Sequence, residues 1–561
     1  MPTIAEVASR LLPSRIPGHP AYASWRECPP WPADVFAVAA KLVNMSGCYA
    51  DERYADARKD KCFFSDGYIK KSQKIGARWA KGHLPREVRS LWQTLVGSNA
   101  EVTEGPEGGW KDAAIQLIAI ADEAARGFGF VPPEDQALPF ASLLHSEYVR
   151  WASGRTYKYM PYLPNSVCLG VPPSEVCVQP KSRTPQVGCS LRSLTHNLAL
   201  LPSVGEVRSV WRLGAPSDAT EGPLNLLLIP YPYHLVGQTF RPSTNLIDES
   251  VLYFTIHQDW LCHKNRQLQP AEIGQFICEL IENAKGDTGR IHGVVLPECA
   301  LDDAVVEPLA KYLAKATQLE LFVSGLMSRP QSSGGLPRNS VYSCIFSKQR
   351  LFAQWKQHKH HRWRVDGSQI TRYNLGNALA PGSVAAPALW WENIDISKRE
   401  VTFRVFRDGA SLAVLICEDL ARVDPIQPVV RAVGPNLVIA LLQDGPQWER
   451  RWPGRYATTL ADDPGSAVLT LTSLGMVCRS VPPGEAEPRT VALWKDPYGR
   501  AQELVLPPRA HGLVLTISSS YETNCTLDRR PDYGATACLS LSGVRAVTHP
   551  SPPKWVEGPS R

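Results

Sequence analysis

Apolar residues recur at helical spacing between Trp31 and Arg150. Segments with this pattern are ADVFAVAAKLV (33–43), KDAAIQLIAIADEAARGF (111–128) and FASLLHSEYVRWA (140–152). Apolar positions three and four residues apart gather on one face of a helix and can pack against a core. The pattern therefore predicts a mainly α-helical N-terminal domain over residues 1–160.

The periodicity is lost in the next segment, which is rich in Pro, Ser, Thr and Gly. These residues favour turns and loops. We interpret residues 161–222 as a linker or an irregular subdomain, in which VWRL (210–213) is a short-strand candidate.

From Leu224 onwards, short apolar runs alternate with amphipathic segments. LNLLLIPYPY (224–233) predicts a buried strand, and AEIGQFICELIENAKG (271–286) predicts a helix that ends at Gly286 as its C-cap. HGVVLP (292–297) predicts another strand. Further strands are expected at 319–326, 340–346, 401–406, 411–418 and 437–443, and further helices at 303–317 and 425–433.

Strands that are apolar throughout and alternate with helices indicate an α/β core whose sheets are buried on both faces. We place this domain at residues 223–545. The remaining residues, 546–561, include the Pro- and Ser-rich stretch THPSPPKWVEGPSR and are predicted to be a disordered tail.

Composition narrows the class of protein. A chain of 561 residues is longer than the chains that usually fold around a single hydrophobic core, so we expect two or three domains. The formal net charge of +6 is small for this length and does not by itself indicate a polyanionic partner. The 14 cysteines lack the CxxC pairs of zinc sites and are expected to be reduced thiols. No run approaches the roughly 18 apolar residues of a membrane helix, so we expect a cytoplasmic protein without membrane association.

Two of the predicted apolar strands end in residues with reactive side chains. Glu298 follows HGVVLP, and Cys417 follows SLAVLI. A carboxylate can take the proton of a thiol, and the thiolate can attack an acyl or nitrile carbon if a cation stabilises the oxyanion that forms. The segment between the two strands offers Lys356 and Lys359 as that cation.

The order Glu, Lys, Cys within one alternating α/β region resembles the nitrilase superfamily of carbon–nitrogen hydrolases, over about residues 223–540. VVLPE (294–298) is similar to the family's glutamate strand. Lys356-Gln357-His358 is similar to its lysine motif, and LICEDLAR (415–422) to its cysteine turn. Softer matches are Asn339-Ser340, Arg455 and TSLGMV (472–477), the last resembling a late strand with its glycine.

The resemblance implies a four-layer α-β-β-α sandwich that forms homo-oligomers and needs no metal or organic cofactor. It also implies that Glu298 deprotonates Cys417, and that Lys356 and the backbone N–H of Glu418 hold the oxyanion. A thioester would form as ammonia or an amine leaves, and water activated by Glu298 would hydrolyse it. The family usually has a second glutamate between lysine and cysteine, for which Glu392 is the best-placed candidate and Glu400 a poorer one.

One departure from the family pattern leaves the identity of the active-site lysine undecided. The interval from Lys356 to Cys417 is longer than expected, so either an insertion occupies residues 364–390 or Lys359 is the active-site amine. His358 and the pair His360-His361 have no carboxylate or cysteine at ligand spacing. We therefore interpret these histidines as solvated loop residues rather than metal ligands.

Two functions follow from these patterns. The first is an amidase-like carbon–nitrogen hydrolase acting on a small amide, since CED at the cysteine turn is similar to the glutaminase branch of the family. The second is a catalytically silent scaffold or sensor whose N-terminal region binds nucleic acid or protein, with a role in anti-phage defence as one form of it. Residues 53–89 carry 11 Lys or Arg against four Asp or Glu, interleaved with aromatic residues, a composition suited to nucleic-acid contact.

Overall fold

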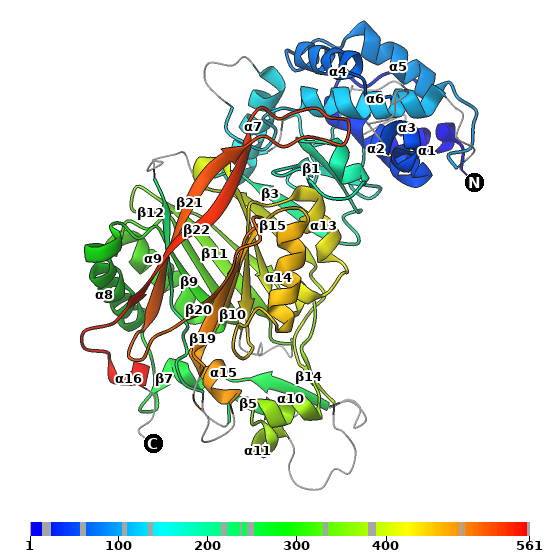
Figure 1. Cartoon of the computed structure of the whole chain (residues 1–561). Helices are drawn as coiled ribbons and strands as arrows, with labels where there is room; N and C mark the ends of the chain where they lie inside the picture. The colour runs from blue at the N-terminus through cyan, green and yellow to red at the C-terminus, as the bar shows by residue number, and fades with distance from the viewer. Residues whose placement is uncertain are drawn as a thin grey trace.

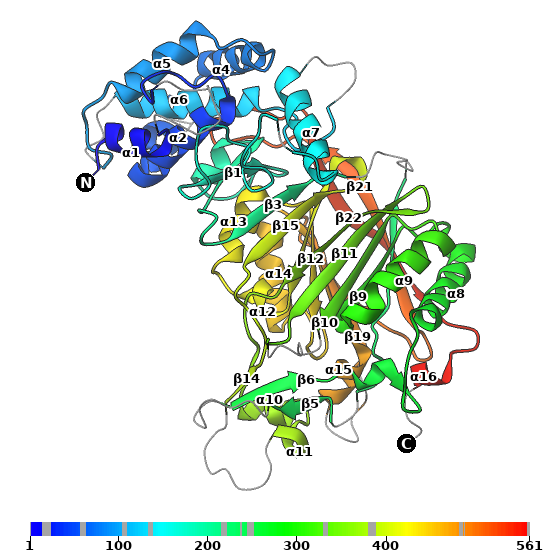
Figure 2. The same cartoon turned by 180° about the vertical axis from the view of Figure 1, so that it is seen from behind.

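The computed structural model has a helical domain at one end, two stacked sheets in the middle and a small sheet at the opposite end (Figures 1 and 2). The residues that the structure describes are 2–13, 24–55, 63–103, 109–132, 138–156, 158–214, 222–235, 238–243, 252–328, 335–379, 389–481, 486 and 488–557.

The N-terminal domain is helical, as predicted. Its helices are α1 (Ile4–Leu11), α2 (Pro32–Ser46), α3 (Glu52–Ala55), α4 (Asp66–Trp79), α5 (Arg86–Val96), α6 (Gly109–Ala124) and α7 (Pro139–Ala152). Helix α6 packs against α2, α4 and α5 and is buried on nearly all sides. A helix that is apolar around most of its circumference belongs in a core rather than at a surface, which explains its central place.

Two seven-stranded sheets face each other in the middle of the molecule. The first, in spatial order, contains β12 (Arg350–His358), β11 (Asn339–Ser347), β10 (Leu321–Met327), β9 (Gly293–Leu301), β4 (Leu224–Leu228), β21 (Gly512–Glu522) and β22 (Thr536–Val547). The second contains β20 (Ala501–Val505), β19 (Thr490–Lys495), β18 (Ala467–Thr472), β17 (Leu437–Leu442), β16 (Ser411–Ile416), β15 (Glu400–Val405) and β3 (Arg208–Arg212). Strand β9 contacts β17 and β18 of the other sheet, and β11 contacts β16.

Helices cover the outer side of each sheet. On the first sheet, α8 (Pro270–Thr288) packs on β21 and β22, and α9 (Asp303–Ala316) packs on β10, β11 and β12. On the second sheet, α14 (Trp452–Asp462) packs on β18 and β19, with α13 (Ile426–Val433) beside it (Figure 1). The central strands are therefore shielded from water on both faces, which is why their sequences are apolar throughout. The α-β-β-α sandwich predicted from the sequence is confirmed.

A small four-stranded sheet lies below the sandwich in Figure 1. Its strands, in spatial order, are β13 (Arg364–Val365), β14 (Trp390–Glu392), β6 (Leu252–Ile256) and β5 (Phe240–Pro242). Helices α10 (Gly367–Arg372) and α11 (Gly376–Leu379) lie between β13 and β14 in the chain. Phe240, Phe254 and Trp363 are among the residues of its own apolar cluster. Of the extra residues between the lysine motif and Cys417, the described residues 364–379 and 389–392 thus form part of a small folded unit.

The segment between the helical domain and the sandwich is held by two buried carboxylates. Strands β1 (Cys177–Pro180) and β2 (Leu198–Leu201) pair within it, and β3 adds a strand to the second sheet, as the pattern of VWRL suggested. Asp34 of α2 accepts the backbone N–H groups of residues 169–171, and Asp122 of α6 accepts those of residues 196–198. The described residues 158–214 of this connection are therefore held against the helical domain, while the domain boundaries drawn from the sequence remain predictions.

Local predictions were wrong in three places. Helix α8 continues through Gly286 to Thr288, and its C-cap is Gly289, whose φ of 70° suits glycine. In TSLGMV (472–477), Thr472 ends strand β18, but residues 474–477 belong to helix α15 (Leu474–Arg479) instead of a strand. The predicted tail is ordered as far as residue 557, because α16 (Lys554–Glu557) places Trp555 against the core. Residues 558–561 lie outside the described residues.

Candidate active site

Glu298 lies within β9, close to the edge of the sheet where the small unit begins. Its neighbour on β10 is Gly325, where a Cβ atom would lie 2.4 Å from the Cα of Glu298 and 2.4 Å from the carbonyl oxygen of Pro297. Only a glycine lets β10 approach this backbone so closely. The packing of two strands therefore fixes the position of the Glu298 carboxyl, which is 1% exposed.

Cys417 forms the turn between β16 and the short helix α12 (Glu418–Ala421). Its backbone has φ 44° and ψ −106°, a strained conformation for a residue with a side chain, and its N–H donates to the carbonyl of Leu441 in β17. Strain of this kind persists only when the surrounding structure imposes it, and it is common where a reactive side chain must be presented. The thiol is almost fully buried.

The two candidate lysines occupy different environments. Lys356 lies within β12, and its Nζ is 2.9 Å from Asp303 and 3.2 Å from Glu307 of helix α9, on the outer side of the sheet. Lys359 follows the end of β12 and is buried, with its Nζ 2.9 Å from Oε1 of Glu298 and 2.7 Å from Oε2 of Glu392. Lys356 therefore lies apart from Glu298, and Lys359, the alternative amine, lies beside it.

Glu392, the better placed of the two candidate second glutamates, belongs to this cluster. It lies at the last position of β14. Asn339, at the start of β11, donates from one Nδ2 to Oε1 of Glu298 at 2.7 Å and to Oε1 of Glu392 at 2.8 Å. The backbone N–H of Trp363 donates to the second oxygen of Glu392 at 3.0 Å. Both carboxylates are thus held apart at fixed positions around one ammonium group. Glu400, the poorer candidate, lies in β15, where its backbone contacts His360.

Asp419, two residues after the cysteine, holds the segment that carries the lysine. Its carboxylate accepts the backbone N–H of His360 at 3.1 Å and lies 3.0 Å from Nδ1 of His361. His360 is fully buried, so the interpretation of a solvated loop histidine is wrong for this residue. Across the described residues, no three His, Cys, Asp or Glu side chains are grouped so as to hold a metal ion.

The sheets themselves bring Lys359 and Cys417 into one site. Gln357 of β12 donates to the carbonyl of Val414 at 2.8 Å and accepts the backbone N–H of Thr402 at 2.9 Å. This buried amide links the lysine strand to the strands before the cysteine. The strand that leads to Lys359 is therefore hydrogen-bonded to the strand that leads to Cys417.

Charges in the cluster set its proton distribution. Burial raises the pKa of the Cys417 thiol well above its usual value; the charge of Glu298 adds to this rise and that of Lys359 opposes it. Burial also raises the pKa of Glu298, with Glu392 adding to the rise against the opposing effect of Lys359. Burial alone would lower the pKa of Lys359, but Glu298, Glu392 and Cys417 outweigh it and keep the pKa well above its usual range. The resting site thus holds an ammonium group and a protonated thiol.

Several polar atoms in the cluster region are buried without hydrogen-bond partners among the described residues. They include Oε2 of Glu298, Oδ1 of Asn339, and both Nε2 and Oε1 of the side-chain amide of Gln443. The backbone of Gln443 also contacts the Cys417 thiol and lowers its pKa. Buried polar atoms in folded proteins nearly always have a partner, so unpaired ones point to water or a ligand. The sequence analysis missed Gln443, because a polar residue after an apolar strand has no distinctive signal.

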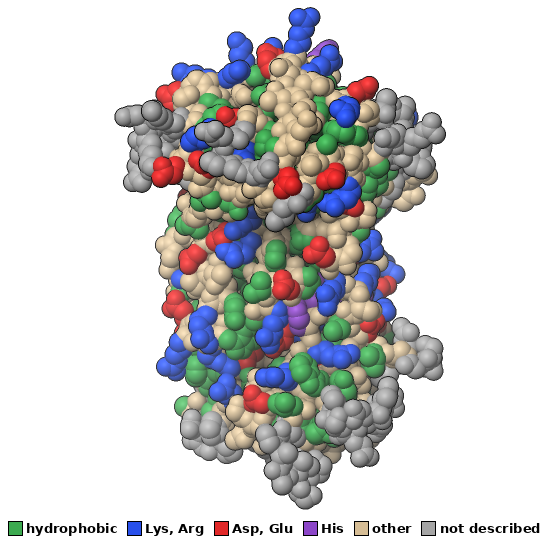
Figure 3. Space-filling model, turned by 90° about the vertical axis from the view of Figure 1, so that its right-hand side faces the viewer, with side chains coloured by type: hydrophobic (Ala, Val, Ile, Leu, Met, Phe, Trp, Pro, Cys, Tyr) green, Lys and Arg blue, Asp and Glu red, His purple; other side chains and the backbone are tan. Residues whose placement is uncertain are grey.

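The basic segment 53–89 carries charged side chains but exposes few aromatic rings. Tyr54, Phe64 and Trp79 are fully buried, and Tyr68 is nearly so. These aromatic residues therefore serve the core of the helical domain and cannot stack on bases. On the face drawn in Figure 3, basic and acidic side chains are interspersed. Nucleic-acid contact through this segment remains a prediction; residues 56–62 lie outside the described residues.

No helix in the described part of the chain combines the length and apolar character needed to cross a membrane. The 13 cysteines that the structure describes form no disulfide with one another.

Comparisons with known proteins return similarities in structure only. No protein-family model matches the sequence, and no curated protein matches it closely enough to count as a relative. About half of the chain is similar to solved structures of nitrilase and carbon–nitrogen hydrolase superfamily proteins.

Three of these structures illustrate the similarity. Nit3 of Saccharomyces cerevisiae, described as a member of branch 10 of the nitrilase superfamily, has 13% identity and a TM-score of 0.29, with 52% of this chain and 89% of that chain covered. A carbon–nitrogen hydrolase from Helicobacter pylori has 12% identity and a TM-score of 0.24, with 45% and 74% covered. The NitFhit protein of C. elegans has 14% identity and a TM-score of 0.28, with 50% and 57% covered. The fold assignment rests on the two sheets and their helices described above.

Proposed function

We propose that this chain hydrolyses a carbon–nitrogen bond of a small amide, with Cys417 as nucleophile, Glu298 as general base and Lys359 as oxyanion stabiliser. The observation that carries the proposal is the Lys359 ammonium group, buried between Glu298 and Glu392 and electrostatically coupled to Cys417. Burying one cation and two carboxylates is costly, and a merely structural core could use apolar side chains instead.

The proton distribution supports general-base chemistry. Since the pKa of Cys417 is well above its usual value, its proton must move to a base as the sulfur attacks. Oε2 of Glu298 is unpaired and can accept that proton. The raised pKa of Glu298 makes it a better acceptor than an ordinary glutamate.

In the proposed reaction, Sγ of Cys417 attacks the amide carbon while Glu298 takes the thiol proton. The carbonyl electron pair moves onto oxygen, and Lys359 and the backbone N–H of Glu418 stabilise the resulting oxyanion. Glu298 then gives its proton to the nitrogen, the carbon–nitrogen bond breaks, and ammonia or an amine leaves a thioester on Cys417. Water, deprotonated by Glu298, attacks the thioester and releases a carboxylic acid and the free thiol.

Glu392 is proposed as a positioning residue. It accepts a hydrogen bond from Lys359 beside Glu298, so the ammonium group keeps one carboxylate partner when Glu298 is protonated during the reaction. The unpaired amide of Gln443 offers one donor and one acceptor, which matches the two polar atoms of a substrate amide.

The direct test measures ammonia release from a panel of small primary amides and identifies the acylated residue by intact-mass and peptide analysis with p-nitrophenyl acetate. We expect acetylation of Cys417 in the wild type and none in Cys417→Ala, with turnover lost in Cys417→Ala and in Glu298→Gln. Cys525→Ser changes an exposed cysteine and serves as the control, with unchanged labelling of Cys417. Equal labelling of Cys417 in Glu298→Gln would argue against the general base, and no labelling in wild type would argue against the nucleophile.

The pH profile gives a second prediction. Because burial raises the pKa of Glu298, the carboxylate needed as base is lost at a higher pH than for an ordinary glutamate. We expect kcat/KM to fall by about tenfold per pH unit on the acidic side of that raised pKa. In Glu392→Gln, loss of the neighbouring negative charge should move this limb to lower pH. Asp303→Asn, on the outer helix α9, should leave the limb where it is; an equal shift in both variants would contradict the assignment.

A further inference from the structure

Helix α4 carries basic side chains along one face, at the end of the molecule formed by the helical domain (Figures 1 and 2). A helix turns by about 100° per residue, so its basic positions fall within an arc of about 100° around the axis. They are Lys70, Lys71, Lys74 and Arg78, and Lys81 follows in the turn after the helix. All five side chains are exposed. We call these five residues the basic stripe.

The opposite face of α4 is fixed by the core of the helical domain. Tyr68, Ile75 and Trp79 of that face are buried. Gly76 lets helix α6 approach so closely that a Cβ atom at this position would lie 2.4 Å from the Cβ of Glu123. The packing against α6 therefore turns the basic stripe toward solvent.

Basic residues outnumber acidic ones throughout this stretch of chain. Residues 66–93 hold seven Lys or Arg against two acidic residues, Asp66 and Glu87. Asp66 lies 3.6 Å from Arg529 of the segment that joins β21 to β22, and Glu87 of α5 lies 2.6 Å from Arg78. Each of the two carboxylates thus pairs with an arginine, and the stretch keeps an excess of positive charge.

The spacing within the basic stripe is unfavourable in the free protein. Lys70 and Lys74 stand four positions apart, as do Lys74 and Arg78, and like charges at this spacing destabilise a helix. A helix face that serves only to contact water more often alternates acidic and basic residues. A polyanion lying along the stripe would turn this repulsion into attraction.

The length of the basic stripe suits a nucleic-acid backbone. The distance along the helix from Lys70 to Lys81 is about 16 Å, at about 1.5 Å per residue. Duplex DNA carries one phosphate charge per about 3.4 Å of its axis on each strand, so a stretch of this length presents about five charges on one strand. The five side chains of the stripe match that number.

The surroundings of the basic stripe favour a duplex over a membrane or a single strand. Helices that bind membranes insert apolar side chains beside their cations. No large apolar side chain is exposed among the described residues of α4 and α5. Single strands bind by stacking their bases on aromatic rings, but Tyr68 and Trp79 of α4 are buried.

We infer that the basic stripe binds the phosphate backbone of a nucleic-acid duplex without reading its bases. Lysine and arginine side chains along one helix face are the electrostatic footprint of such binding. Contacts to phosphates position a protein on a duplex and carry no sequence information. The inference does not rest on the proposed hydrolase chemistry, because the stripe belongs to the helical domain and the candidate site to the sandwich.

The test is fluorescence anisotropy of a labelled short DNA duplex, titrated with the full-length protein at several salt concentrations. We expect saturable binding that weakens at least tenfold in the triple variant Lys70→Gln/Lys74→Gln/Lys81→Gln. The slope of log affinity against log salt should fall in magnitude by about 2–3, because each lost phosphate contact removes about 0.9 from it. The three side chains are exposed, so their removal should leave the fold intact.

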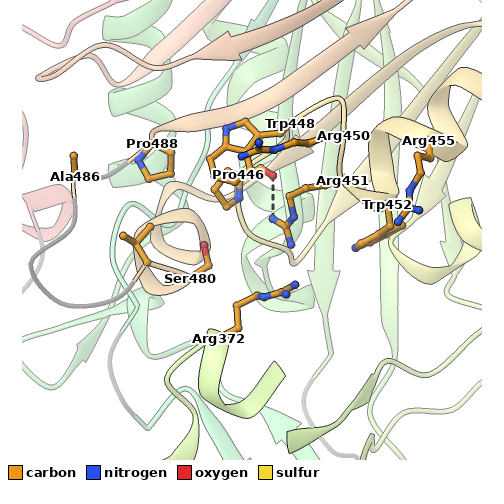
Figure 4. A pocket seen from close by; sticks show the side chains of 11 residues that line it. Arg372, Pro446, Trp448, Arg450, Arg451, Trp452, Arg455, Ser480, Ala486 and Pro488 are labelled. Atoms are coloured by element: carbon orange, nitrogen blue, oxygen red, sulfur yellow. Dashed lines mark hydrogen bonds between the residues drawn. The ribbon is translucent and has the colours of Figure 1, made fainter. Parts of the chain in front are cut away.

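A second group of basic side chains supplies the matched control. Arg372, Arg450 and Arg455 line a cavity of 580 Å³ between α10 and the start of α14, and Figure 4 shows them around a common space. A cavity of this size has room for a small molecule but not for a duplex. The triple variant Arg372→Gln/Arg450→Gln/Arg455→Gln removes equal charge from exposed positions and should bind the duplex as the wild type does.

Equal weakening in both triple variants would reduce the effect to overall charge and overturn the inference, as would absence of duplex binding in the wild type. Tighter binding of a single strand than of the duplex would overturn the assignment to a duplex. Vesicles that contain phosphatidylserine test the membrane alternative. If they bind the wild type and not the stripe variant while the duplex binds neither, the surface belongs to a membrane and the inference fails.

Discussion

Replacing Lys359 by methionine is expected to abolish turnover and to destabilise the protein, while the same change at Lys356 leaves both nearly unaltered. Removal of the Lys359 ammonium leaves Glu298 and Glu392 buried with only neutral donors, Asn339 and the backbone N–H of Trp363, among the hydrogen bonds described above, and with no cation between them. Breaking a buried ion pair by deleting one partner typically costs about 3–5 kcal/mol. Loss of the oxyanion partner should reduce kcat by about 100- to 1,000-fold or more.

Lys356→Met is the matched control, since it deletes the same group three residues away. Lys356 pairs with Asp303 and Glu307 at a partly exposed position, where an ion pair contributes about 0–1 kcal/mol. Denaturant unfolding measures the stability of each variant, and ammonia release measures its turnover. The site assignment would be refuted if Lys356→Met lost activity and Lys359→Met kept it.

The second large effect is expected at Arg530, which joins the helical domain to the sandwich. The hairpin of β21 and β22 reaches up to the helices in Figure 1, and its connecting segment carries Arg530 into a fully buried position. There the guanidinium group lies 2.9 Å from Asp528, 3.2 Å from Asp122 and 3.0 Å from Glu123. Burial alone would lower the pKa of Arg530, but these three carboxylates raise it above the usual value and keep the group charged.

Arg530→Met should therefore destabilise the protein by about 3–5 kcal/mol, because three buried carboxylates lose their common cation. The adjacent Arg529 pairs with Asp66 at an exposed position, so Arg529→Met should cost about 0–1 kcal/mol. Unfolding midpoints and limited proteolysis compare the two variants. We expect faster cleavage between the helical domain and the sandwich only in Arg530→Met; equal behaviour of the two would show that this ion cluster does not hold the domains together.

Sequence patterns could predict most of the sandwich because its signals are local. The apolar strands and amphipathic helices are visible as short runs, and Glu298 and Cys417 stand out as reactive residues at the ends of such runs. The residues at which helices and strands end were harder to predict from the sequence. The end of α8 depends on which glycine adopts positive φ, and Gly286 and Gly289 look alike in the sequence.

The choice between the two lysines could not be made from the sequence, because it depends on strand register. Side chains alternate between the two faces of a strand. The pairing of Tyr342 with Lys356 and of Ser340 with His358 turns Lys356 toward helix α9, while Gln357 faces the other sheet. Lys359 lies one residue past the strand, where its direction depends on its neighbours and on Asp419.

The sequence by itself thus determined the layered α/β core, the helical N-terminal domain, and the glutamate and cysteine of the candidate site, since each is set by contiguous residues. Only the tertiary structure decided which lysine lies between Glu298 and Glu392 and how the carboxylates of the helical domain hold the segment after it. These features join residues far apart in the chain. They exist only once the sheets have packed and buried their charges together.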